Sequence, residues 1–356
     1  MSAFTIDELT IPDTLDGPGG ADFIRALEVS NEVEALGYGT PDLAYEPDEE
    51  LAISHNPHEP SRIVVARVDG EIVARAKHET TVGDVADTSW LAINVLPDFR
   101  RRGIGTALAD AVEGIAREEG KTKVVLYAPI AEGPGERLPS PTGFGSIVAG
   151  GEGVRFLQQR GYSFEQVERL SRLALPVDDL DALVAAAQER SGADYRLHTW
   201  HGSTPEEWRA DIAHLGTRMS TDAPTAGLEE PEDAWTVERV IESDERAARE
   251  SPRVRHVAAV EHVPSGHLVG YTVLSVPPQL YRAVDQYATI VLKEHRGHKL
   301  GMLLKVGNLA HLEQKRPGHP SVTTFNAEEN RHMLDVNEAV GFVAIANESA
   351  WRKDLV

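Results

Sequence analysis

The chain of 356 residues contains no cysteine, which excludes disulfide bridges, thiolate metal sites and a cysteine nucleophile together. Basic residues are also scarce, with 35 lysines and arginines against 57 aspartates and glutamates, a formal net charge of −22. This charge serves solubility. It also repels phosphate backbones, so we expect no nucleic acid partner, and it mildly favours cationic ligands such as amines.

Long apolar runs are lacking as well. No segment near the N-terminus is long enough for a signal peptide or a membrane span, so we expect a cytoplasmic protein with no membrane partner. The 14 histidines form no His-x-x-x-His pair, so no metal site is predicted. A serine hydrolase would need Gly-x-Ser-x-Gly, and residues 143–147, Gly-Phe-Gly-Ser-Ile, break that pattern.

The most informative stretch is residues 89–106. Residues 90–96 are apolar and partly β-branched, as in a strand, and the proline that follows ends it. Arg100, Gly103 and Gly105 then form Arg-x-x-Gly-x-Gly before an amphipathic helix. A helix N-terminus leaves backbone N–H groups unpaired, and glycine lets a bulky anion approach them. The stretch therefore predicts a cradle for a pyrophosphate.

This region has a strand, then the motif Pro-x-x-Arg-Arg-x-Gly-Ile-Gly, then an amphipathic helix. In this order it resembles the acyl-CoA loop of the GCN5-related N-acetyltransferase (GNAT) family. A Rossmann dinucleotide loop is the alternative, but it needs a glycine where Arg100 stands. The strand that follows the helix, residues 121–127, also has no acid at its tip. A nucleotide-dependent oxidoreductase is therefore the less favoured hypothesis, to be tested by binding of NAD(P)H against acetyl-CoA.

The same organisation occurs twice. A second strand, residues 286–292, leads into a second loop, in which Arg296 lies 196 positions after Arg100 and Gly301 the same distance after Gly105. Two independent loops at one offset indicate an internal duplication. The resemblance then implies an α+β fold of two tandem GNAT-like domains, each a mixed, mostly antiparallel central sheet flanked by helices.

We expect an N-terminal domain over residues 1–174, a bridging helix over 175–192 and a C-terminal domain over 193–356. Residues 129–153 are rich in proline and glycine and show no periodicity. We interpret them as a structureless loop, either an active-site lid or a mobile insertion.

The resemblance implies acetyl-CoA as acyl donor, CoA as product and the primary amine of a small molecule as acceptor. In this family a backbone N–H of the strand polarises the thioester carbonyl, and the loop holds the pyrophosphate. The residues expected to contact acetyl-CoA in the first domain are Ile93, Asn94, Val95, Arg100, Arg101, Arg102, Gly103, Ile104, Gly105 and Thr106. Those in the second are Thr289, Ile290, Val291, Arg296, Gly297, His298, Lys299, Leu300, Gly301, Asn326 and Asn330.

The usual catalytic acid of the family has no counterpart here. Many members carry a tyrosine four residues before the glycine of Leu-Gly-Phe, and Leu157 and Asn337 occupy that place in the two halves. Asn337 is a candidate for steadying a thiolate, or it caps or packs a helix. Tyr127 is a candidate acid, or it is a core aromatic residue. The general base is not identified.

The two halves differ in their polar residues. Lys299 stands where the first loop has Gly103, so we expect a changed loop geometry or weaker CoA binding in the second half. Asn326, Asn330 and Asn337 occur only in the second half, where the family has polar groups along the pantetheine arm. We predict that both loops bind CoA and that one half, the second by preference, transfers the acyl group.

The resulting hypothesis is an acyl-CoA-dependent N-acyltransferase that transfers acetyl from acetyl-CoA to a small-molecule amine. The alternative is an acyl-CoA-binding sensor or structural protein in which one or both domains are inactive. Acetyl-CoA binding without release of CoA would favour the alternative. No oligomeric state is predicted.

Overall fold

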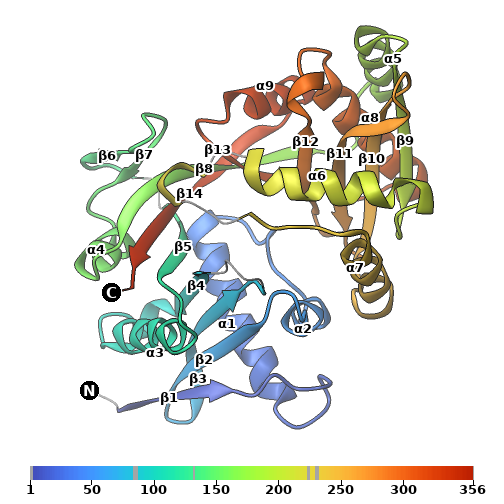
Figure 1. Ribbon diagram of the computed structural model, residues 1–356. Helices are drawn as coiled ribbons and strands as arrows, with labels where there is room; N and C mark the ends of the chain where they lie inside the picture. Colours follow the sequence, from blue (N-terminus) through green and yellow to red (C-terminus); the bar gives the residue numbers. More distant parts are fainter. Residues whose placement is uncertain (1–2, 83–86, 131–132, 223–224, 229–231, 356) are drawn as a thin grey trace.

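The computed structural model describes residues 3–82, 87–130, 133–222, 225–228 and 232–355 (Figure 1). Its helices are α1 (Gly20–Tyr38), α2 (Pro47–Ser54), α3 (Ile104–Glu118), α4 (Glu152–Gln159), α5 (Leu180–Ser191), α6 (Arg209–Asp222), α7 (Val237–Glu250), α8 (Leu300–Lys315) and α9 (Arg331–Val340). Its strands are β1 (Phe4–Leu9), β2 (Ser61–Val68), β3 (Glu71–Thr80), β4 (Thr88–Val95), β5 (Lys123–Pro129), β6 (Arg137–Pro139), β7 (Ser146–Val148), β8 (Ser163–Ala174), β9 (Tyr195–His201), β10 (Val254–His262), β11 (His267–Val276), β12 (Val284–Val291), β13 (Ser321–Ala327) and β14 (Val343–Asp354).

The α+β architecture is confirmed, and the predicted strand, loop and helix occur in both halves as β4 to α3 and β12 to α8. The bridging segment contains α5. The expectation that residues 129–153 are structureless is wrong in part, because β6 and β7 pair there as a short antiparallel hairpin. Local backbone pairing gives order to a segment that has no hydrophobic periodicity.

The two halves share one sheet. Its twelve strands follow the order β1-β2-β3-β4-β5-β14-β8-β13-β12-β11-β10-β9. The last strand of the chain, β14, pairs with β5, while β8 from the first half pairs with β13. Each half therefore completes the sheet of the other, and Figure 1 shows β8 and β14 crossing between the two lobes. The domain boundaries at 174 and 193 stay a prediction, since this exchange joins the halves through backbone hydrogen bonds.

Each half has its own apolar core. The first packs α1 and α3 on strands β2 to β5, and Trp351 of β14, 1% exposed, belongs to this core. The second packs α5 and α8 on β10 to β13, and Leu173 of β8 belongs to it. Burial of side chains from the exchanged strands ties the two cores together. No helix in the described part of the chain is both long and apolar enough to cross a membrane.

Candidate active site

The first loop ends at the N-terminus of α3. Arg101 and Gly103 both have a positive φ, 60° and 87°, and this double left-handed turn directs the chain into the helix. Within the described residues, the first backbone N–H groups of α3, from Ile104 to Thr106, donate no hydrogen bond. Unpaired N–H groups at a helix N-terminus attract an anion.

The fold itself does not require glycine at positions 105 and 301. A Cβ on Gly105 would lie 3.7 Å from the Phe156 ring, and one on Gly301 would lie 3.7 Å from Val336, both ordinary contacts. By contrast, a Cβ on Gly37 would lie 2.4 Å from Pro129, so packing explains that glycine. A Cβ on Gly103 or Gly297 would meet nothing within 4 Å, so the loops are open at these two positions, as a pyrophosphate site requires.

The second loop makes the same double left-handed turn, but its glycine occupies the first of the two positive-φ positions and not the second. Gly297 and Lys299 have φ of 91° and 58°, at the positions of Arg101 and Gly103. The change of geometry expected from Lys299 is therefore not found in these backbone angles, since a lysine here adopts the left-handed conformation. The conformation costs a non-glycine residue about 1–2 kcal/mol, and each loop accepts that cost at one of its two positions.

One arginine in each loop makes the same hydrogen bond to the strand before it. Arg100 donates from Nε to the carbonyl of Val95 at 3.0 Å, and Arg296 donates to the carbonyl of Val291 at 3.1 Å. Each bond ties the loop to the end of the preceding strand. The duplication thus extends from the sequence to the hydrogen bonds.

The surroundings of the two loops differ in charge. Asp222, 3% exposed at the end of α6, accepts from Arg218 at 2.6 Å, from Lys293 at 3.3 Å and from Arg296 at 3.2 Å. In the described part of the chain, Arg100 and its two neighbours in the first loop face no carboxylate within 4 Å. The first loop therefore presents more uncompensated positive charge to an anion.

The strands separate where an acyl-CoA arm would lie. Parallel pairing of β4 with β5 covers only residues 88–91 of β4, and β12 pairs with β13 only at Val284 and Asp285. Beyond these points each strand leaves an edge open to a ligand. Ile93, Asn94 and Val95, and likewise Thr289 to Val291, lie on these separated ends.

Only β12 shows an irregular register beside its loop. Thr272 faces Thr289 and Leu274 faces Gln286, so Tyr287 and Ala288 together oppose Val273 as a β-bulge. The β3–β4 pairing keeps one register throughout. A bulge takes a residue out of the ladder and frees its backbone groups.

Buried side chains hold this bulge in place. The Thr272 hydroxyl donates to the carbonyl of Ala288 at 2.9 Å and lies 2.7 Å from the Thr289 hydroxyl. Gln286 donates from Nε2 to Thr272 at 2.7 Å and to the carbonyl of Val273 at 2.9 Å. Because Thr272 and Gln286 are both buried, these bonds fix the strand rigidly.

The asparagines of the second half lie together at the end of β13. Asn337, 1% exposed, donates from Nδ2 to Oδ1 of Asn326 at 2.6 Å, and its own Oδ1 has no partner in the described residues. Asn330 caps α9, because its side chain accepts from the N–H of Met333 at 3.3 Å. Tyr127 packs beside the small apolar cluster around Val125.

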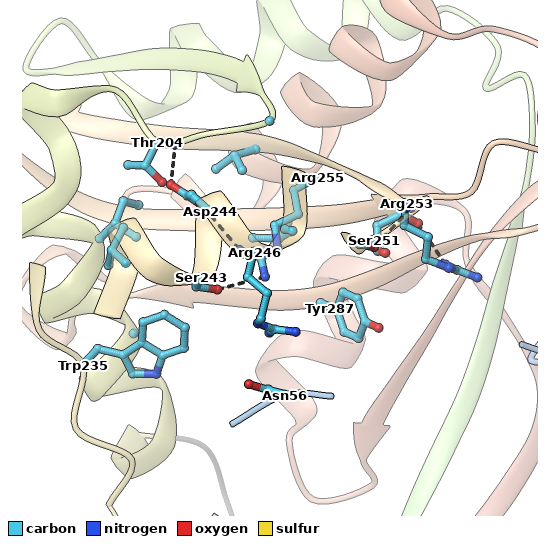
Figure 2. Close-up of a pocket in the computed structure, with 18 of the residues that line it drawn as sticks. Asn56, Thr204, Trp235, Ser243, Asp244, Arg246, Ser251, Arg253, Arg255 and Tyr287 are labelled. Atoms are coloured by element: carbon cyan, nitrogen blue, oxygen red, sulfur yellow. Dashed lines mark hydrogen bonds and ion pairs between the residues drawn. The ribbon is translucent and has the colours of Figure 1, made fainter. Parts of the chain in front are cut away.

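A cavity of about 540 Å³ adjoins the bulge, and sequence reasoning missed it (Figure 2). Strands β10 to β12 form its floor, α6 and α7 form its walls, and α2 of the first half closes it. Its aromatic lining comprises Tyr45, Trp200, Trp235, Tyr271 and Tyr287. The alternation of side chains along β12 could have indicated that Tyr287 lies on the face of the sheet that lines the cavity. The cavity itself could not have been predicted, because α2 and α7 come together only in the folded chain.

Ion pairs join the two halves beside this cavity. Glu49 of α2 accepts from Arg253 at 2.8 Å and from Arg282 at 2.7 Å. Arg253 also pairs with Asp285, whose pKa is raised because burial outweighs the attraction of the arginine. The Tyr287 side chain lines the cavity and is 59% exposed, so its hydroxyl keeps the proton that a tyrosine carries at neutral pH.

The corresponding face of the first half is crossed by hydrogen bonds. The Tyr38 hydroxyl of α1 donates to Glu348 of β14, and Ser30 donates to Asn94 at 3.3 Å. Burial raises the pKa of Glu348 to about 7. Among the described residues, no group of three or more His, Asp or Glu could hold a metal ion.

Comparisons with known proteins agree with this arrangement. Residues 24–132 match the model of the Acetyltransferase (GNAT) family. The chain is 26% identical to a mycothiol acetyltransferase of Salinispora arenicola (strain CNS-205) over 94% of its own length and 93% of that protein. A tandem GNAT protein from the clavulanic acid biosynthesis pathway has a TM-score of 0.73 at 23% identity, over 99% of this chain and 98% of that one. A GCN5-related N-acetyltransferase from Sphaerobacter thermophilus has a TM-score of 0.63 at 16% identity, over 99% and 95%.

Proposed function

We propose that this chain is a tandem GCN5-related N-acetyltransferase and that its second half transfers acetyl from acetyl-CoA to the primary amine of a small molecule. The observation that carries the assignment to this half is the β12 bulge beside the cavity. A bulge takes a residue out of the ladder, and here the cavity beside it offers a space for an acceptor next to the separated strands. The first half has the loop without the bulge.

Both loops have the features of a pyrophosphate site. In the first half the ligand would contact Arg100 to Thr106, with the separated strand 93–95 beside it. In the second half it would contact Arg296 to Gly301, the strand 289–291 and Asn326. Acetyl-CoA supplies an acetyl group activated as a thioester.

The chain's own groups suit the remaining tasks. A backbone N–H at the bulge is our candidate for binding the thioester oxygen, because the hydrogen bonds of Thr272 and Gln286 would fix such a donor before the ligand arrives. Tyr287 is a candidate proton donor in place of the tyrosine absent from α9, since its hydroxyl is protonated and faces the cavity. Asn337 already donates to Asn326, so we assign it a positioning role.

A panel of amines tests the proposal. Purified protein is mixed with acetyl-CoA and with aminoglycosides, polyamines, amino sugars or amino-acid derivatives, and thiol release and acetylated product are measured. We expect at least one amine to give amide and CoA in equal amounts. Binding of acetyl-CoA by calorimetry with no product from any amine would overturn the proposal and favour a CoA-binding sensor.

A further inference from the structure

Among the described residues, Arg246 of α7 is the cavity arginine that forms no direct ion pair. Figure 2 shows its side chain crossing the cavity towards Tyr287 and Asn56. Its hydrogen bond to the chain is a long one, 3.4 Å, to the carbonyl of Ala52 in α2. Among the described residues no acid lies within 4 Å of it, and burial together with Arg255 lowers its pKa.

The neighbouring arginines are already paired. Arg253 binds Glu49 and Asp285, and Arg255 lies 3.4 Å from Asp244 and donates to Ser243 at 3.1 Å. Of the acids in the cavity wall, Asp233 pairs with Arg239 at 2.5 Å, whereas Glu59 accepts from the neutral amide of Asn56 at 2.9 Å and acts on Arg246 at longer range. Within the described residues, Arg246 is therefore the cavity arginine whose guanidinium is left without a direct ion pair, although Glu59 and Glu250 act on it at longer range. An arginine fork suits a carboxylate or phosphate, which it binds through two parallel hydrogen bonds.

We propose that the acceptor amine carries an anionic group, a carboxylate or a phosphate, and that Arg246 binds this group at the junction of α7 and α2. This inference rests on the proposed function, since the ligand is the acceptor of the same reaction. The aromatic walls then hold the apolar part of the acceptor, and the amine lies at the bulge. With a net charge of −22, the protein repels anions at long range, so selection of an anion must come from a local group such as Arg246.

Two matched pairs of amines test the anion and distinguish its sources. The carboxylate arm compares 4-aminobutyrate with 4-aminobutanamide, and the phosphate arm compares glucosamine 6-phosphate with glucosamine. Calorimetry gives the affinity of each for the full chain. We expect the anionic member of at least one pair to bind at least about tenfold tighter, about 1.4 kcal/mol.

Arg246→Gln should reduce that preference to below threefold. Arg246→Lys should keep part of it, since lysine retains the charge without the fork. Arg249→Gln is the matched control on the same helix, because Arg249 is 67% exposed and pairs with Glu250 outside the cavity, and it should keep the full preference. Thermal unfolding of each variant confirms that the fold is retained.

The outcomes separate the two proposals. Equal binding within both pairs, or a preference that Arg246→Gln leaves unchanged, overturns the role of Arg246. Loss of acetyl-CoA affinity in Arg246→Gln with unchanged amine binding also overturns it, because the bound anion would then be CoA. An Arg246-dependent preference without CoA release from any amine supports the anion site and overturns the acetyl transfer.

Discussion

The two halves carry the same loop in different surroundings. Around the first loop the arginines form no ion pair within the described residues, the β3–β4 register is regular and α1 side chains reach the sheet. Around the second, Asp222 holds two of the loop cations, β12 bulges and a cavity opens beside it. The first half thus has a loop suited to a pyrophosphate without the bulge and cavity that we connect with the chemical step. An intact glycine loop alone therefore does not identify the catalytic half.

Valine at the two glycines should have the largest effect and should separate the roles of the loops. Gly301→Val should reduce turnover at least about a hundredfold, about 2.7 kcal/mol, because a branched side chain would crowd Val336 and the N–H groups of this first helical turn. Gly105→Val should weaken CoA binding to the first half at least about tenfold, about 1.4 kcal/mol, and leave most turnover. Calorimetry and the CoA-release assay measure both.

The packing of these glycines makes the test interpretable. A Cβ at either position meets only ordinary contacts, so both positions accept a side chain, and thermal unfolding of each valine variant checks that the fold is retained. Gly37→Val is the contrasting control, since its Cβ would collide with Pro129 and it should lose stability instead. Equal partial losses of turnover in both loop variants would contradict the division of labour, and loss only with Gly105→Val would reverse the assignment.

The helices that follow the loops differ in one buried charge. Lys305 of α8 is 2% exposed and burial lowers its pKa to about 7, while Ala109 occupies the corresponding place in α3. Between pH 7 and 10.5 the unfolded lysine binds a proton that the folded one has lost, so stability should rise with pH in that window. Lys305→Met should therefore stabilise the protein at pH 6 by on the order of 2 kcal/mol.

Urea unfolding at pH 6, 8 and 10 measures this difference. The gain from Lys305→Met should shrink as the pH rises, because the free-energy cost of deprotonating the buried lysine falls as the pH approaches 10.5, the pKa of the unfolded lysine. Lys315→Met, on the same helix but in its last turn, is the control and should give no such trend. A gain that is constant with pH would show that packing, not charge, sets the effect.

Local pattern predicted much of the fold, as the repeated loops illustrate. Arg100 and Arg296 were paired from their spacing, and both make the same bond to a strand carbonyl. Helices and strands followed from periodicity and from glycine and proline positions, because these act within a few residues.

The features that distinguish the halves were not predictable in this way. The exchange of β8 and β14 depends on which distant edges pair, and a strand sequence does not specify its partner. The bulge depends on a contact of Gln286 with Thr272, and the cavity depends on α2 meeting α7. Lys299 also shows that a left-handed turn can persist when its glycine moves two positions.

Loosening the bulge should reduce the chemical step with less effect on binding. Gln286→Leu removes the donor that joins Thr272 to the carbonyl of Val273, so the backbone N–H should lose its fixed position. We expect kcat to fall about tenfold, about 1.4 kcal/mol, with little change in the KM for acetyl-CoA. Steady-state kinetics provide the measurement.

Gln166→Met is the matched control for this change. Gln166 is also buried in the sheet, in β8, and donates to Glu329 at 2.6 Å away from the bulge. Both variants should lose similar stability, but only Gln286→Leu should lose kcat. A similar fall of kcat in both would show that general weakening of the sheet, not the bulge, controls the reaction.

Removing the charge of Asp222 should make the second loop more like the first. Asp222→Asn frees Lys293 and Arg296, whose side chains are 58% and 40% exposed, to turn towards a bound phosphate. The basic partners of Asp222 are exposed to solvent, so screening keeps the gain in CoA affinity small. We expect CoA to bind the second half about threefold tighter, about 0.7 kcal/mol. The gain should be larger at 50 mM than at 500 mM salt, since added salt screens the freed cations. Titration of CoA into variants that also carry Gly105→Val isolates binding at the second loop. Weaker CoA binding in Asp222→Asn would contradict the prediction, because it would show that the carboxylate holds these cations in the position that the phosphate needs.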